Sequence, residues 1–135
     1  MNHEQAQEVW AEALDSGGHV QGKGRLQKKH RFCCLGIACL IAEQHGVFVN
    51  RALKTGEIVG SNLTSQPAVK EWLGLKNACG GFLESQEEDV NMDLATSLAP
   101  VATALTELND DYYGKGSTFT QIAAIIRSKP KGLFV

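Results

Sequence analysis

The sequence predicts one α+β domain that spans residues 1–135 and is mostly helical, with a few short strands. Two observations support this class. The length of 135 residues and the hydrophobic content of 43% suit a single packed globule. Runs of apolar residues at helical spacing also alternate with glycine-rich stretches that are too irregular for helices. No repeat or linker divides the chain, so we expect one core.

The first element is a helix. Asn2 and Gln5 have the spacing of a capping box, in which each side chain binds the backbone N–H of the other residue. The apolar stripe that follows consists of Val9, Trp10, Ala13 and Leu14. The sequence SGG at 16–18 predicts the end of this helix.

The second and third elements adjoin each other. From His19 to Phe32 the residues alternate loosely around two glycines, which favours a turn or a short hairpin over a helix. The run CCLGIACLIAEQHG is then apolar on nearly every side and predicts a buried central helix that begins at Cys33 or Cys34. Gly46 stands where such a helix commonly ends.

The middle of the chain predicts three short elements. Phe48-Val49 suits a short strand. After Ser65-Gln66, proline in the first turn predicts a helix that ends at Gly74 and turns Val69, Trp72 and Leu73 inward. The stretch from Ala78 to Met92 carries glycines and then acids, and it predicts a hairpin or loop.

Two helices are predicted near the carboxyl end. After Pro100, the residues Val101, Ala104, Leu105 and Leu108 repeat at helical spacing. Ser117 or Thr118 has the chemistry of a helix cap. The inner face of this last helix consists of Phe119, Ile122, Ala123 and Ile126.

The sequence has no recognisable export or membrane segment. Its amino terminus is polar, and the longest apolar stretch, from Phe32 to Ala42, is only about half the length that spans a bilayer. The four cysteines are Cys33, Cys34, Cys39 and Cys79, and three of them crowd one apolar segment, unlike a disulfide framework. We therefore expect reduced thiols, a cytoplasmic protein and no membrane partner.

Charge is unevenly distributed along the chain. The net charge of −2 excludes a general nucleic-acid coat protein. Basic residues nevertheless gather between Gly18 and Arg31, where no acidic residue occurs. The later acidic cluster consists of Glu84, Glu87, Glu88, Asp89 and Asp93. The sequence thus predicts two opposed patches.

The basic segment HVQGKGRLQKKHR leads directly to the amino end of the central helix and predicts an anion-binding site. Glycines let backbone N–H groups approach a ligand, a helix amino end carries partial positive charge, and Lys and Arg add formal charge. The alternative is a solvated hairpin that is charged for solubility. The pattern matches neither the P-loop nor the dinucleotide fingerprint. The candidate ligands for a phosphate or carboxylate are Gln21, Lys23, Arg25, His30, Arg31 and Cys33.

A second group of candidates lies in the sequence ELNDDYY at 107–113. Asn109 and Asp110 could bind polar groups of a ligand or a divalent cation, and Tyr112 could stack on a flat base. The alternative is that Asn and Asp simply form a turn after a helix. The following GKG would let this segment close over a ligand.

Cysteine chemistry is the alternative enzymatic hypothesis. A thiol at a helix amino end beside His30 and Arg31 would have a lowered pKa, as in thiol hydrolases. His45 lies about three helical turns away on the same helix and cannot act as the base. Buried cysteines also commonly serve as core residues. No C-x-x-C pair exists, so no metal site is predicted. We also expect no cofactor, and a non-catalytic protein is favoured over an enzyme.

The segments QGKGRL, RFCCLGIAC, VKEWLGL, LTELND and STFTQIAAII, in this order, together resemble a family of small bacteriophage and prophage proteins of no settled activity. The resemblance spans most of the chain and implies a phage-encoded protein in the host cytoplasm. Accessory proteins of this kind often counter host defence. One hypothesis is sequestration of a phosphate-containing nucleotide signal by the basic loop. The other is an inhibitor that docks on a host defence protein through Glu84 to Asp93. The sequence is also compatible with a homo-oligomer.

Overall fold

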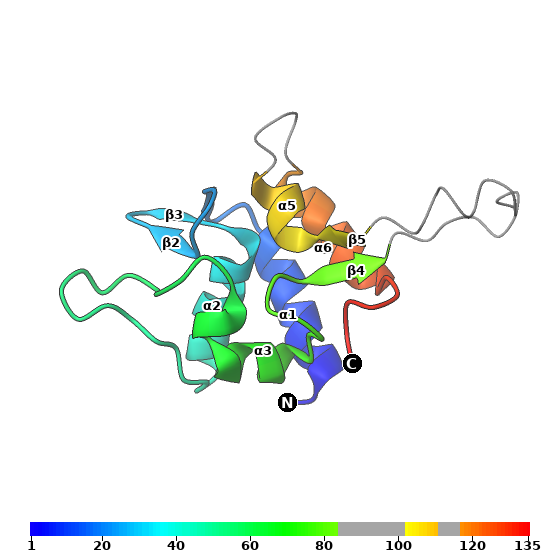
Figure 1. Cartoon of the computed structure of the whole chain (residues 1–135), viewed down its shortest axis with the longest axis horizontal. Helices are drawn as coiled ribbons and strands as arrows, with labels where there is room; N and C mark the ends of the chain where they lie inside the picture. Colours follow the sequence, from blue (N-terminus) through cyan, green and yellow to red (C-terminus); the bar gives the residue numbers. More distant parts are fainter. Residues whose placement is uncertain (84–101, 111–116) are drawn as a thin grey trace, which may run out of the picture.

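The computed structural model of the chain describes residues 1–83, 102–110 and 117–135. Helix α1 packs against α6, α2 and α3, and α5 lies against α2 and α6 (Figure 1). This part of the chain forms an α+β domain with short strands, so the predicted class is confirmed. Its helices are α1 (His3–Asp15), α2 (Cys34–Gln44), α3 (Pro67–Leu73), α5 (Leu105–Asp110) and α6 (Phe119–Ser128), with a 3-10 turn η1 (Leu63–Ser65).

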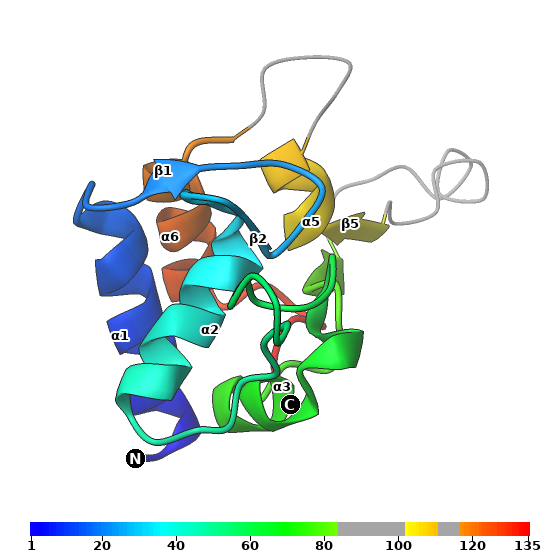
Figure 2. The same cartoon turned by 90° about the vertical axis from the view of Figure 1, so that its left-hand side faces the viewer.

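The strands form two small sheets. The first contains β1 (Val20–Gln21), β2 (Gln27–Lys28) and β3 (Arg31–Phe32) in the order β1-β3-β2. Strand β3 is parallel to β1 and antiparallel to β2. This sheet lies over the amino end of α2 (Figure 2). In the second sheet, β4 (Gly81–Leu83) pairs antiparallel with β5 (Ala102–Ala104).

The core surrounds α2, which is buried along most of its length. Trp10 on α1 is fully buried, and its Nε1 donates a hydrogen bond to the Cys34 carbonyl at 2.9 Å. Gly36 on α2 lies against the backbone of Leu26, where a Cβ would be 1.8 Å from the Leu26 carbonyl oxygen. Only glycine therefore lets the segment directly before β2 lie this close to α2.

The predicted helix ends agree with the structure. Asn2 and Gln5 form the capping box of α1. Cys33 is the cap residue before α2, and Gly46 follows its end with a positive φ. Gly74 ends α3 in the left-handed conformation. The last helix is capped by Thr118, the second of the two residues proposed for it.

One predicted element is wrong, and another is shorter than its apolar pattern suggests. Phe48-Val49 forms no strand; Phe48 is exposed, and the neighbouring Asn50 N–H donates to the side chain of Gln66 at 2.7 Å instead of to a strand. The helix expected after Pro100 begins only at Leu105, because the residues before it pair with β4 as strand β5. From position 84 on, the predicted 78–92 loop lies outside the described residues.

The described residues agree with two further expectations about the chain. All four cysteines are free thiols. In the three described ranges, the longest and most apolar helices fall short of what a membrane crossing requires.

Candidate anion-binding site

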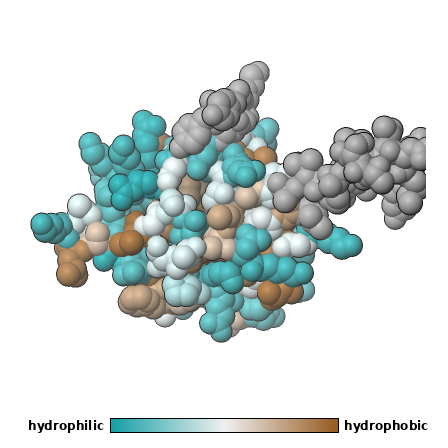
Figure 3. Space-filling view, viewed as in Figure 1, coloured by the Kyte–Doolittle hydropathy of each residue, from teal (hydrophilic) through white to brown (hydrophobic). Residues whose placement is uncertain are grey.

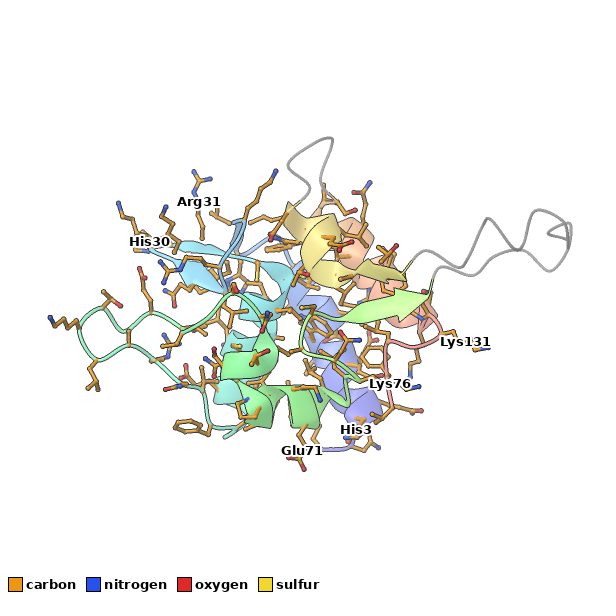
Figure 4. The ribbon with its side chains drawn as sticks, viewed as in Figure 1. His3, His30, Arg31, Glu71, Lys76 and Lys131 are labelled. Carbon is orange, nitrogen blue, oxygen red and sulfur yellow. The ribbon has the colours of Figure 1, made fainter. Side chains whose placement is uncertain are left out.

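The exposed turn between β2 and β3 carries four basic side chains. We call residues 27–32 the basic hairpin. Lys28, Lys29, His30 and Arg31 are exposed and line a surface hollow of about 360 Å³. His30 and Arg31 extend away from the body of the molecule (Figure 4), and the surface over this end is strongly hydrophilic (Figure 3). Four basic residues therefore line one hollow, and the apolar parts of their side chains form most of its surface.

Contacts with the segment at 57–58 hold the backbone of the basic hairpin. Lys29 adopts a positive φ of 57°, and its N–H donates to the Glu57 carboxylate at 2.8 Å. The Gln27 side chain donates to the Lys29 carbonyl at 2.9 Å and accepts from the Ile58 N–H at 2.9 Å. The turn that carries the basic side chains is thus fixed on both sides.

The buried side chain of Asn109 ties the glycine loop at 21–24 to α2. Its Oδ1 accepts hydrogen bonds from Gln21 Nε2 at 3.0 Å and from the Cys34 N–H at 3.1 Å. Its Nδ2 donates to the Gly22 carbonyl and to Asp110 Oδ1, both at 2.8 Å. Asn109 is completely buried, so these contacts are part of the framework below the surface.

Two further contacts complete this framework. Asp110 Oδ1 accepts from the Gly24 N–H at 3.0 Å, and Gln21 Nε2 also donates to the Ser117 carbonyl at 2.8 Å. The polar residues of the LND sequence therefore bind the glycine loop itself. This arrangement supports the interpretation of Asn109 and Asp110 as structural residues.

The amino end of α2 binds atoms of the protein. The Cys34 N–H donates to Asn109, the Gly36 N–H donates to Cys33 Sγ at 3.4 Å, and the Ile37 N–H donates to the Cys33 carbonyl at 3.1 Å. In the glycine loop, the Gly22 N–H likewise donates to Phe32. An anion at this end of the molecule would therefore be held by the basic side chains, because these amides already have partners.

The thiols at the start of α2 are buried and protonated at neutral pH. Burial raises the pKa of Cys33 to about 11, and the nearby Asp110 carboxylate adds to this effect. Burial also raises the pKa of Cys34 well above its ordinary value. The lowered thiol pKa expected from the sequence is wrong, because desolvation outweighs the helix amino end and the neighbouring cations. This geometry does not favour a thiolate nucleophile.

The structure divides the predicted site residues between two places. Gln21, Asn109 and Asp110 meet in the framework below the surface, and Cys33 is the buried cap of α2, whereas His30 and Arg31 lie on the basic hairpin. Lys23 and Arg25 are exposed on the loop between them, and Tyr112 lies outside the described residues. The site residues missed by the sequence analysis are Lys28 and Lys29. Their place directly before His30 and Arg31 was the available signal.

Comparison with protein-family models finds a match over most of the chain. The model of a family described as a domain of unknown function (DUF8296) covers residues 1–130. No curated protein and no solved structure matches the chain. The family match supplies no activity, so the function is argued from the site.

Proposed function

We propose, for a chain that belongs to the DUF8296 family, that the basic hairpin binds a phosphate-containing small molecule and that the protein acts by sequestering it. The observation that carries this proposal is the hollow bordered by Lys28, Lys29, His30 and Arg31. Its volume of about 360 Å³ falls in the lower part of the range for small-molecule sites, roughly 300–1,000 Å³. That size suits a ligand of about one nucleotide.

The chemistry of the side chains supports a phosphate. An arginine guanidinium can donate two parallel hydrogen bonds to phosphate oxygens, and lysines add point charges beside it. Arg31 and Lys28 are both exposed and lie opposite each other across the paired strands β3 and β2. Exposed charges are screened by salt, so binding should weaken as ionic strength rises.

The motifs that resemble phage proteins supply the biological setting of this proposal. We suggest a phage-encoded protein in the host cytoplasm that removes a nucleotide signal used in host defence. The resemblance supports this setting, and the basic hairpin supports the ligand class. The alternative of an inhibitor that docks through Glu84 to Asp93 concerns a segment outside the described residues.

Calorimetric titration of the full chain with cyclic nucleotides, ADP-ribose and inorganic phosphate tests the proposal. Arg31→Gln should weaken nucleotide binding at least about tenfold, because a hydrogen bond to a charged group is worth about 1.5–3 kcal/mol. Lys70→Gln removes the same charge from α3 and should leave binding unchanged. Equal affinities for the two variants, or no binding by the wild type, would refute the proposal.

A further inference from the structure

A second cavity lies at the other end of the molecule, between the start of α1 and the carboxyl-terminal tail. We call it the terminal cleft. It has a volume of about 570 Å³. Figure 4 shows His3, Lys76 and Lys131 along one edge of the molecule, opposite the end that carries His30. The cleft is lined by His3, Glu4, Gln7, Lys76, Lys129, Pro130, Lys131, Gly132, Phe134 and Val135.

The walls of the terminal cleft are fixed by backbone pairing. The Lys76 N–H donates to the Leu133 carbonyl at 3.0 Å, and Leu75 forms an antiparallel bridge with Phe134. The imidazole of His3 lies against Gly74, where a Cβ would be 2.6 Å from Nδ1. These contacts hold the tail, the segment after α3 and the start of α1 around the same space.

Lysines outnumber carboxylates in the lining of the terminal cleft, where Lys76, Lys129 and Lys131 face Glu4 and the last residue, Val135. Lys76 and Lys131 are exposed, and in the described ranges neither forms an ion pair within 4.0 Å. Lys129 has Glu4 at 3.8 Å. The positive end of the α1 dipole lies at the same place, because His3 and Glu4 begin that helix and line the cleft. An anionic group would balance this charge.

The buried side chain of Gln7 adds a hydrogen-bond acceptor. Gln7 is 5% exposed, and its Nε2 donates to the Leu73 carbonyl at 2.9 Å. Its Oε1 accepts no hydrogen bond from any residue that the structure describes, and because no buried side-chain atom there lacks a partner, this oxygen must be accessible to solvent. Since Gln7 lines the cleft, this oxygen suits a hydroxyl group of a ligand, and half-buried Phe134 provides an apolar wall.

We propose that the terminal cleft is a second ligand site, for a small organic phosphate that carries a hydroxyl group. Lys76 and Lys131 bind the phosphate, and Gln7 accepts a hydrogen bond from the hydroxyl. This site is independent of the basic hairpin, because the two share no residue. The failure of either proposal leaves the other standing.

Nuclear magnetic resonance of the full chain, titrated with glycerol 3-phosphate, tests the second site by location. The backbone amides of His3, Lys76 and Lys131 should shift together with one dissociation constant. The Lys76→Gln/Lys131→Gln variant should bind at least about tenfold more weakly at these amides. Lys54→Gln/Lys70→Gln removes the same charge elsewhere and should bind like the wild type. Equal weakening by both variants would mean diffuse attraction and would overturn the proposal.

The role of Gln7 is tested with a ligand that lacks the hydroxyl. Methyl phosphate carries the same charged group as glycerol 3-phosphate but cannot donate to the Oε1 of Gln7. It should bind the wild type about fivefold more weakly at the same amides. Equal affinities for the two phosphates would overturn the assignment of Gln7. The absence of any shift at His3, Lys76 and Lys131 would overturn the site.

Discussion

Asn109 uses its entire hydrogen-bonding capacity below the surface of the protein. Its Oδ1 has two donors, Gln21 and Cys34, and its Nδ2 has two acceptors, Gly22 and Asp110. Among the side chains, only Asn and Gln offer an oxygen that accepts two hydrogen bonds and a nitrogen that donates two, and Gln is longer. The residue therefore fixes both the glycine loop and the start of α2.

Replacement of this amide should be costly. In Asn109→Asp an oxygen would replace the donor beside the Gly22 carbonyl and the Asp110 carboxylate, and a buried charge would lack a partner. We expect a loss of about 3 kcal/mol or more in the free energy of unfolding, measured with urea. Asn62→Asp is the control, because its Oδ1 only accepts from the Thr64 N–H and a carboxylate can do the same. Similar losses for both variants would contradict this role.

At the scale of elements, the position of α2 depends on its contact with the loop before it. Leu26 is fully buried, its N–H donates to the Gly60 carbonyl, and its carbonyl accepts from the Cys33 N–H. That carbonyl lies over Gly36. The loop therefore packs on α2 backbone to backbone, with no side chain between them.

The variant Gly36→Ala distinguishes the effect of helix propensity on stability from the effect of packing. Inside a free helix, Gly→Ala is stabilising by about 1 kcal/mol. In Gly36→Ala the methyl group would overlap the Leu26 carbonyl, so we expect a loss of about 3 kcal/mol, measured by thermal unfolding. Gly18→Ala is the control, since a Cβ there meets only Ser16 Oγ at 3.6 Å. A stabilised Gly36→Ala would show that α2 can move away from the loop.

The elements that the sequence predicted well are those with local signals. The capping box of α1 involves residues three apart, and the cap of α6 is a Thr directly before an apolar stripe, so the sequence alone indicates both helix starts. Strand β5 was missed because its partner β4 is distant in the chain, and the spacing of Ala104, Leu105 and Leu108 also fits a helix. The framework around Asn109 was missed for the same reason, since Cys34 is 75 positions away.

At the scale of the whole molecule, the core depends on keeping its thiols neutral. Cys33, Cys34 and Cys39 are all buried around α2. Burial raises the pKa of each of them, because a thiolate would lose its hydration. The proposed ligand sites lie at the surface on either side of this core, in the basic hairpin and the terminal cleft.

Stability should fall in alkaline solution. A thiol whose pKa is raised on folding stabilises the folded state fully below the ordinary pKa of about 9, and this contribution is lost as pH rises toward the folded pKa. For Cys33, which titrates at about 11, the loss amounts to about 3 kcal/mol between pH 9 and 11.

Urea unfolding at a series of alkaline pH values measures this loss. Cys33→Ala removes one titrating group and should show a shallower decrease in the free energy of unfolding above pH 9. The wild type at neutral pH is the reference for the intact core. The same pH dependence in the variant and the wild type would contradict a contribution from Cys33.

The conformation of the glycine loop depends on residues that are distant in the chain. Gln21 is held by Asn109, 88 positions later, and by the carbonyl of Ser117. A synthetic peptide of residues 19–32 would lose both anchors and with them its shape. Transplanting the glycine loop into another scaffold therefore requires α5 and Ser117, the residue before the cap of α6, to be grafted with it.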